Sequence, residues 1–172
     1  MKKLTAILLL ICLAVSLVGC TQEKELTDPV RFHYLQAPQT DGELPHGTAD
    51  SVIAPEVREG AEYRHDLELM LDIYLHGPLD KDYLSPYPVG TTLRQFAVAD
   101  SGATVVLSNH FASLSGLDLT LACGCLAMTV MDLTGAESVT IRTEGTLSAD
   151  TDSITMTRND LVLFDTATPE TD

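Results

Sequence analysis

The sequence predicts a small mixed α/β domain with the element order β-β-α-β-β-α-β and a short β extension after it. Three observations predict this class. Several short segments alternate apolar and polar residues, as strands do, and two longer segments carry the three- and four-residue spacing of helices. Turn-forming residues separate these segments. A chain of 172 residues accommodates one compact domain with tails.

The first two strands are expected at 30–35 and 51–57. The first alternates apolar and polar side chains from Val30 to Leu35. The second contains Pro55, which lacks a backbone N–H and therefore indicates an edge strand or a bulge. The residues between the two strands, 39–50, are rich in turn formers and predict a loop.

An amphipathic helix is expected at 62–76. Its apolar residues recur at spacings of three and four, and Gly77-Pro78 ends it because proline cannot continue a helical ladder. A loop over 81–91 containing proline and tyrosine follows.

A hairpin and a second helix come next. Strands at 92–99 and 103–108 flank Asp100-Ser101-Gly102, where Gly102 allows a turn with positive φ. The segment 117–133 predicts a helix that is apolar nearly all round, which indicates burial on more than one side. Gly135 closes this helix.

The C-terminal part begins with a strand at 138–143. Beyond it, the pattern weakens over an extension at 147–165, where short apolar runs at 154–157 and 161–164 are compatible with a hairpin. Residues 166–172 form an acidic tail.

The N-terminus has the pattern of a bacterial secretory signal. Lys2 and Lys3 precede an apolar run too short to predict a membrane-spanning helix in the mature protein. The run ends in Leu17-Val18-Gly19-Cys20, which resembles a lipobox. The resemblance implies cleavage after a signal peptide of residues 1–19, diacylglycerol on the Cys20 sulfur, and a linker that extends to residue 29. The alternative is a plain secretory signal with an incidental cysteine.

The charge is strongly acidic, at −15 for the whole chain. Removal of Lys2 and Lys3 with the signal makes it two units more negative. Such a field repels phosphate backbones and anionic lipids, so no nucleic-acid partner is expected. Attachment to the membrane is therefore expected through the diacylglycerol on Cys20, since two acyl chains hold firmly.

No cofactor, metal site or catalytic residue is predicted. The five histidines lack the spacing of metal ligands. Ser108 and His110 lack the glycines of a nucleophile elbow, so a hydrolase triad is not favoured. Cys123 and Cys125 lie in an apolar run and are interpreted as small buried core residues.

A contact patch is the main candidate for a binding surface. It consists of Tyr83, Pro86 and Tyr87, whose rings on a proline-rich loop suit a partner protein or a glycan. The alternative, that both tyrosine rings cover the edge of the sheet, is weighted equally.

Several segments together resemble the GerMN domain of sporulation and spore germination proteins. The resemblance spans 30–146 and rests on the order of the segments that carry it: Leu75-His76-Gly77-Pro78, Tyr87 to Leu93, Asp100 to Ser108, Phe111 with the following helix, and Val139 to Arg142. The chain departs from the family at Cys123-Gly124-Cys125 and beyond Gly145.

The resemblance implies a fold like that of ring-building modules, with the helices packed on one sheet. It implies a lipid-anchored extracytoplasmic protein, not an enzyme, that binds envelope proteins or self-associates, with a link to sporulation or germination. The alternative is a lipoprotein that binds a ligand or peptidoglycan.

Overall fold

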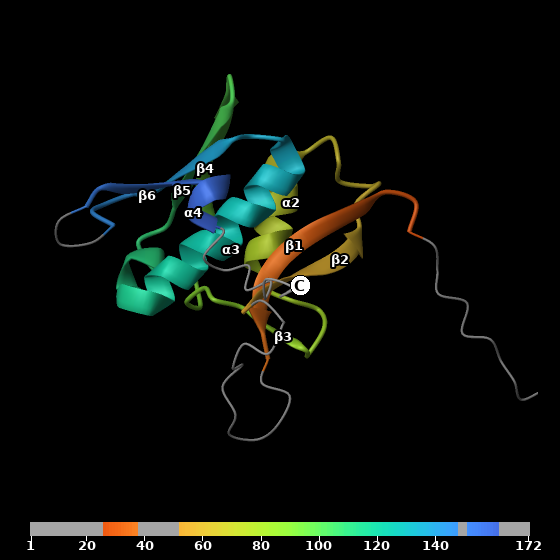
Figure 1. Ribbon diagram of the computed structural model, residues 1–172, viewed down its shortest axis with the longest axis horizontal. Helices are drawn as coiled ribbons and strands as arrows, with labels where there is room; N and C mark the ends of the chain where they lie inside the picture. Colours follow the sequence, from red (N-terminus) through yellow and green to blue (C-terminus); the bar gives the residue numbers. More distant parts are fainter. Residues whose placement is uncertain (1–25, 38–51, 148–150, 162–172) are drawn as a thin grey trace, which may run out of the picture.

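The computed structural model describes residues 26–37, 52–147 and 151–161 (Figure 1). The elements follow the predicted order, with a two-residue strand and two short helices in addition. They are β1 (Pro29–Gln36), β2 (Ile53–Glu59), α2 (Leu67–Leu75), β3 (Tyr83–Leu84), β4 (Leu93–Ala99), β5 (Gly102–Leu107), the 3-10 helix η1 (Phe111–Ser113), α3 (Gly116–Thr134), β6 (Ser138–Thr143), β7 (Ser153–Thr157) and α4 (Arg158–Leu161).

The strands form two sheets. The first is antiparallel, with β1 between β2 and β3. The second has the order β4-β5-β6-β7 and is antiparallel except for the parallel pair β5 and β6. That pair is connected through α3, because parallel neighbours need a crossover. The predicted mixed α/β class is confirmed, but the expectation of one sheet is wrong.

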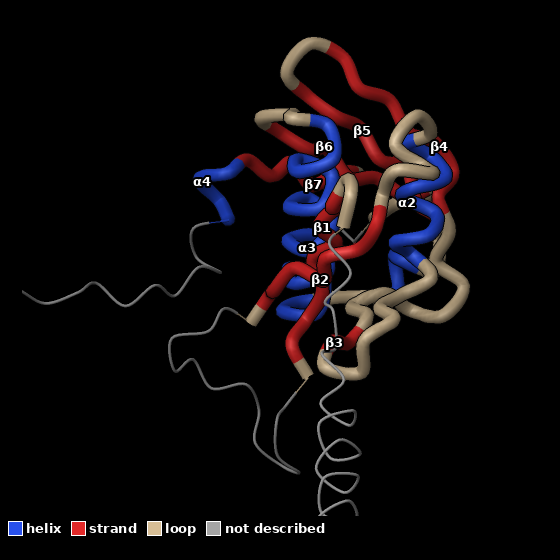
Figure 2. The backbone as a smooth tube through the Cα atoms, turned by 90° about the vertical axis from the view of Figure 1, so that its right-hand side faces the viewer, coloured by secondary structure: helices blue, strands red, loops and turns tan. Residues whose placement is uncertain are grey.

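The two sheets cover different sides of α3. This helix contacts β1 and β2 of the first sheet and β5, β6 and β7 of the second (Figures 1 and 2). One sheet covers only one side of a helix, and α3 is apolar nearly all round. By length and composition α3 is also apolar enough to span a membrane, but more than half of it is buried within this fold. Its burial identifies it as a core helix.

Cys123 and Cys125 are buried in α3, as predicted, with exposed fractions of 1% and 0%. Both are free thiols. Burial raises the pKa of both side chains, that of Cys123 to about 12. The thiols therefore stay protonated and serve as small apolar core groups.

Three tyrosines connect the first sheet to α2 and α3. The Tyr34 hydroxyl donates to the backbone carbonyl of Tyr74 at 2.7 Å, and the Tyr74 hydroxyl donates to the carbonyl of His33 at 2.8 Å. The Tyr74 hydroxyl also accepts a hydrogen bond from Tyr87, since its own hydrogen is already used. The Tyr87 oxygen lies 3.4 Å from the carbonyl of Ala122 in α3.

The first helix is shorter than expected. It begins at Leu67, not at residue 62, because the Asp66 carboxylate accepts the N–H of Leu69 at 3.0 Å and caps the helix. Residues 61–65 form turns before it. Tyr63 falls within the range predicted for the helix, but it lies in this turn region.

The C-terminal hairpin does not begin its second run as predicted, because Leu161 lies in α4 and not in a strand. Its first run forms β7, which pairs with β6 and completes the second sheet. The chain then turns into α4, because the Asp160 carboxylate accepts both the backbone N–H and the hydroxyl of Thr157 at 2.8 and 2.7 Å. This is the acidic half of a capping box. Residues 162–164 lie outside the described part of the chain.

Three turn and edge predictions can be compared directly. Pro55 does lie in an edge strand, since β2 pairs only with β1 in the first sheet. Gly135 closes α3 with a φ of 74°, as expected. In the β4–β5 hairpin, however, the residue with positive φ is Asp100, at 51°, and not Gly102.

His33 joins β1 to α3. Its backbone N–H donates to the Thr129 hydroxyl at 2.9 Å, and its ring Nε2 lies 2.9 Å from the Asp132 carboxylate. The hydrogen bond with His33 lowers the pKa of Asp132 below its ordinary value, and the charge of Arg158 adds to this effect.

We expect Asp132→Asn to lower the free energy of unfolding by about 1 kcal/mol at pH 7, a modest value because the carboxylate is partly exposed. Because the pKa of Asp132 is lower in the folded state than in the unfolded chain, its carboxylate stabilises the fold above the ordinary pKa of 3.8. This stabilisation is lost as the pH falls through the folded-state pKa. The difference in the free energy of unfolding between wild type and variant should therefore shrink as the pH falls below 3.8. Urea unfolding followed by circular dichroism measures it, and a difference that persists undiminished would contradict this account.

Candidate functional site

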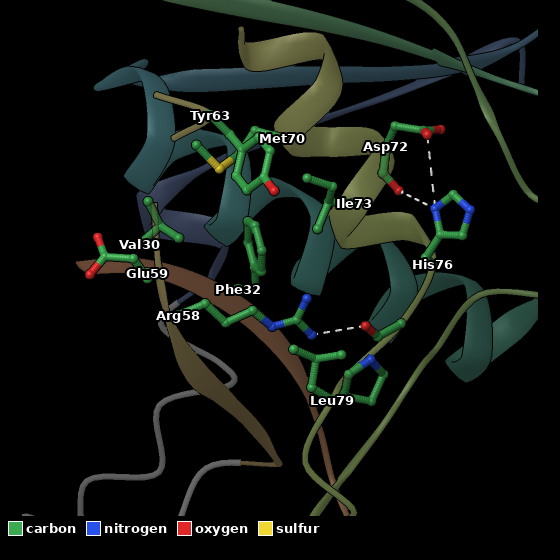
Figure 3. A pocket seen from close by; sticks show the side chains of 12 residues that line it. Val30, Phe32, Arg58, Glu59, Tyr63, Met70, Asp72, Ile73, His76 and Leu79 are labelled. Carbon is green, nitrogen blue, oxygen red and sulfur yellow. Dashed lines mark hydrogen bonds and ion pairs between the residues drawn. The ribbon is translucent and has the colours of Figure 1, made fainter. Parts of the chain in front are cut away.

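An open groove of about 650 Å³ lies beside the first sheet, between β2 and α2 (Figure 3). Its lining is mainly apolar. Val30 and Phe32 are two apart on β1 and so face the same side, and Met70 and Ile73 are three apart on α2 and share one face of that helix. Leu79, from the loop after α2, completes the apolar lining.

Arg58 of β2 lies at the centre of the groove (Figure 3). Its guanidinium carbon lies 5.0 Å from the ring centroid of Phe32 and 5.7 Å from that of Tyr34, which are cation–π distances. The same guanidinium donates to the Gly77 carbonyl at 2.9 Å and to the Tyr34 hydroxyl at 3.4 Å. It is therefore held by the protein itself.

Glu56 neutralises this buried cation. The Arg58 Nε donates to its carboxylate at 2.9 Å, and a second guanidinium nitrogen donates to the same oxygen. The other carboxylate oxygen accepts the N–H groups of Leu79 and Asp80 at 3.0 and 2.9 Å. Glu56 is only 7% exposed. The ion pair thus fastens the loop after α2 to β2, and it leaves no net charge at the centre of the groove.

The rim of the groove is acidic. On α2, the Asp72 carboxylate lies 3.9 Å from Nδ1 of His76, and that ring nitrogen is 2.7 Å from the Asp72 backbone carbonyl. Both side chains are well exposed. At the other wall, Glu59 lines the groove at the end of β2. Two carboxylates therefore border an apolar lining.

Glu59 also fixes the point where the chain enters the domain. Its carboxylate accepts the N–H groups of Thr27, Asp28 and Ala61 at 2.9, 3.1 and 3.2 Å. These backbone hydrogen bonds lower the pKa of Glu59. Arg64 forms an ion pair with Asp28 next to it. The start of the described chain is thus bound beside the groove.

The predicted contact patch does not form as expected. The Tyr87 ring is only 8% exposed and packs between the rings of Tyr74 and Phe111, with centroids 5.5 and 6.2 Å away. It fills the core and is not available to a partner. Tyr83 of β3 is half-buried, and its hydroxyl donates to the carbonyl of Pro55 in β2, on the far side of β1. This arrangement favours the alternative of rings that cover the sheet, and Pro86 is left half-buried beside them.

The structure does not assemble a catalytic group around Ser108. Its hydroxyl donates to the Gly90 carbonyl at 3.2 Å and accepts the N–H of Thr92 at 3.1 Å, while Nδ1 of His110 lies 3.4 Å away. The hydroxyl therefore ties two loops together. Within residues 26–37, 52–147 and 151–161, no group of three or more His, Cys, Asp or Glu side chains is placed to hold a metal ion. Cys20 lies outside these residues.

Sequence reasoning did not find the groove. The signal available was the alternation of Glu56 and Arg58, which places two opposite charges on one face of a strand. The apolar lining, the neutralised cation and the acidic rim can accommodate an apolar group, and they present no nucleophile with a base beside it.

The fold and this groove define a small α/β domain with a mainly apolar groove on one side. The family model for Germane, described as sporulation and spore germination, matches residues 34–148. This chain therefore belongs to the Germane family, as its resemblance to GerMN domains predicted. A comparison with curated protein sequences found no match.

One solved structure shows the same fold at low identity, and two others are similar to this chain with lower scores. The tandem GerMN domains of the sporulation protein GerM from Bacillus subtilis match with a TM-score of 0.50 and 13% identity, over 78% of this chain and 46% of that one. The first GerMN domain of the same protein matches with a TM-score of 0.47 and 16% identity, over 69% and 84%. A Clostridium perfringens chain described as a lipoprotein matches with 0.46 and 16%, over 79% and 93%.

We expect Glu56→Ala to lower the free energy of unfolding by about 3–5 kcal/mol, because it leaves the Arg58 charge buried without its partner. The matched control is Glu144→Ala, which removes an exposed ion pair with Arg94 at 3.2 Å and should cost less than about 1 kcal/mol. Urea unfolding measures both variants. Equal losses in the two variants would show that Arg58 does not depend on Glu56.

Proposed function

We propose that this chain is a lipid-anchored, extracytoplasmic protein of the cell envelope whose Germane domain binds other proteins and catalyses no reaction. The groove beside β2 and α2 carries this proposal. Its lining is mainly apolar, and the cation at its centre is already neutralised by Glu56. Such a surface suits the docking of an apolar group, whereas catalysis needs an available reactive group. The family description, sporulation and spore germination, supports a role of the protein in one of these processes.

The anchor is the diacylglycerol proposed on Cys20. The six residues from Cys20 to Glu25 span at most about 20 Å when extended, and Thr27 and Asp28 are bound to Glu59 at the groove. A partner held in the groove would then lie close to the outer surface of the membrane. Another envelope protein or a second copy of this chain would meet that requirement.

The groove volume also falls within the range of small-molecule sites, about 300–1,000 Å³. This observation favours a second candidate function, the binding of a small ligand or a peptidoglycan fragment. The two functions differ in whether a protein contacts the exposed residues of the groove.

We expect Cys20→Ala to abolish lipid attachment, because the thiol is the proposed acceptor of diacylglycerol. Metabolic labelling with an alkyne fatty acid should mark wild type and not the variant, and the variant should be unprocessed or released from the membrane. A Cys12→Ala variant is the control, because that cysteine lies within the proposed signal peptide. A mature, membrane-bound Cys20→Ala protein would contradict the proposed anchor.

We expect a photoreactive amino acid at Leu79 to crosslink a protein in cells, because Leu79 lines the groove and is 82% exposed. The control position is Val89, which is 99% exposed and is not among the groove's lining residues. Mass spectrometry of the purified adducts identifies the partner. Failure to obtain a protein adduct specific to Leu79 would contradict protein binding in the groove and favour the small-ligand function.

A further inference from the structure

We infer that the groove between β2 and α2 binds a basic segment of another protein and takes up one apolar side chain of that segment. This inference rests on the proposed protein-binding function and names the chemistry of the partner. It follows from the combination of an apolar lining with an acidic rim.

The lining requires an apolar side chain. Leu79, which is 82% exposed, and Tyr63, which is 37% exposed in the turn before α2, supply the exposed apolar lining, whereas Phe32 and Met70 are each only 1% exposed and belong to the core beside it. A groove with a mainly apolar lining suits an apolar side chain of a ligand. The rigid tyrosine contacts between β1 and α2 hold the two walls in place before a ligand arrives.

The rim requires a positive charge. Arg58 offers no free charge because Glu56 neutralises it. Asp72 is half exposed and has no cationic Lys or Arg partner among the described ion pairs, and Glu59 is bound only to backbone N–H groups. Lys or Arg side chains beside an apolar anchor would therefore meet two carboxylates that no Lys or Arg of the described residues neutralises.

Charge argues against segments of this chain as the occupant. Residues 38–51 contain three acidic residues and no Lys or Arg, and the same is true of residues 162–172. A second copy brings another formal charge of −15 to the interface. A basic segment of a different protein fits the rim better than any of these.

The test uses the mature chain, residues 20–172 without lipid, and three fluorescent nonapeptides followed by anisotropy. One peptide has a central Leu flanked by Lys on both sides, the second replaces each Lys by Glu, and the third replaces the Leu by Ser. We expect the first to bind at least about tenfold more tightly than the others, with an affinity that falls as salt rises.

Two matched pairs of variants locate the binding. Asp72→Asn should weaken the Lys peptide about two- to fivefold, whereas Glu68→Gln, on the same helix but outside the groove lining, should not. Leu79→Ser should weaken it as well, and Val89→Ser should not. Circular dichroism confirms that each variant is folded.

Three outcomes would overturn this inference. They are no binding of any peptide, equal binding of the Lys and Glu peptides, and equal effects of the two variants within a matched pair. The proposed function fails separately, through the crosslinking experiment at Leu79. An adduct at Leu79 together with equal peptide binding would therefore keep protein binding and remove only the basic partner.

Discussion

The buried hydroxyl of Tyr74 is the contact on which the arrangement of this domain depends. It donates to the His33 carbonyl in β1 and accepts from Tyr87 in the loop before β4, while the Tyr74 backbone carbonyl accepts from Tyr34. These groups are buried, and a buried polar group without a partner is costly. The network therefore fixes the first sheet relative to α2 and holds the loop containing Tyr87 against α3. The distance between the two walls of the groove follows from it.

Arg58 depends on the same arrangement. Its guanidinium packs on the rings of Phe32 and Tyr34, and these rings in turn contact the ring of Tyr74 at centroid distances of 5.4 and 5.0 Å. Glu56 then neutralises Arg58 and binds two N–H groups of the loop after α2. The centre of the groove is thus rigid and carries no net charge, so its electrostatic character comes from Glu59 and Asp72 at the rim.

The sequence predicted those features that depend on neighbours in the chain. Periodicity located most elements to within a few residues, Pro55 indicated an edge strand, and the apolar run around Cys123 indicated burial. The sequence could not predict the groove, because Arg58 and Glu56 form hydrogen bonds with residues 19 to 24 positions away in the chain.

The position of Tyr87 was predicted wrongly for a related reason. A proline-rich loop is typical of an exposed segment, but here the Tyr87 ring is buried and packs against the ring of Phe111. The second sheet was missed because periodicity gives strands and not their pairing.

Glu59 connects the groove to the entry of the chain, and this connection constrains how the anchored domain can work. The same carboxylate that lines the rim binds the N–H groups of Thr27 and Asp28. These bonds favour its ionised form, so the order of the chain entry maintains the negative charge at that end of the groove. Gly60 supports this contact, because a Cβ at that position would lie 2.3 Å from a methyl carbon of Val30. The entry segment and the groove are therefore built from one set of contacts, and a partner bound at this rim would lie next to the segment that leads to Cys20.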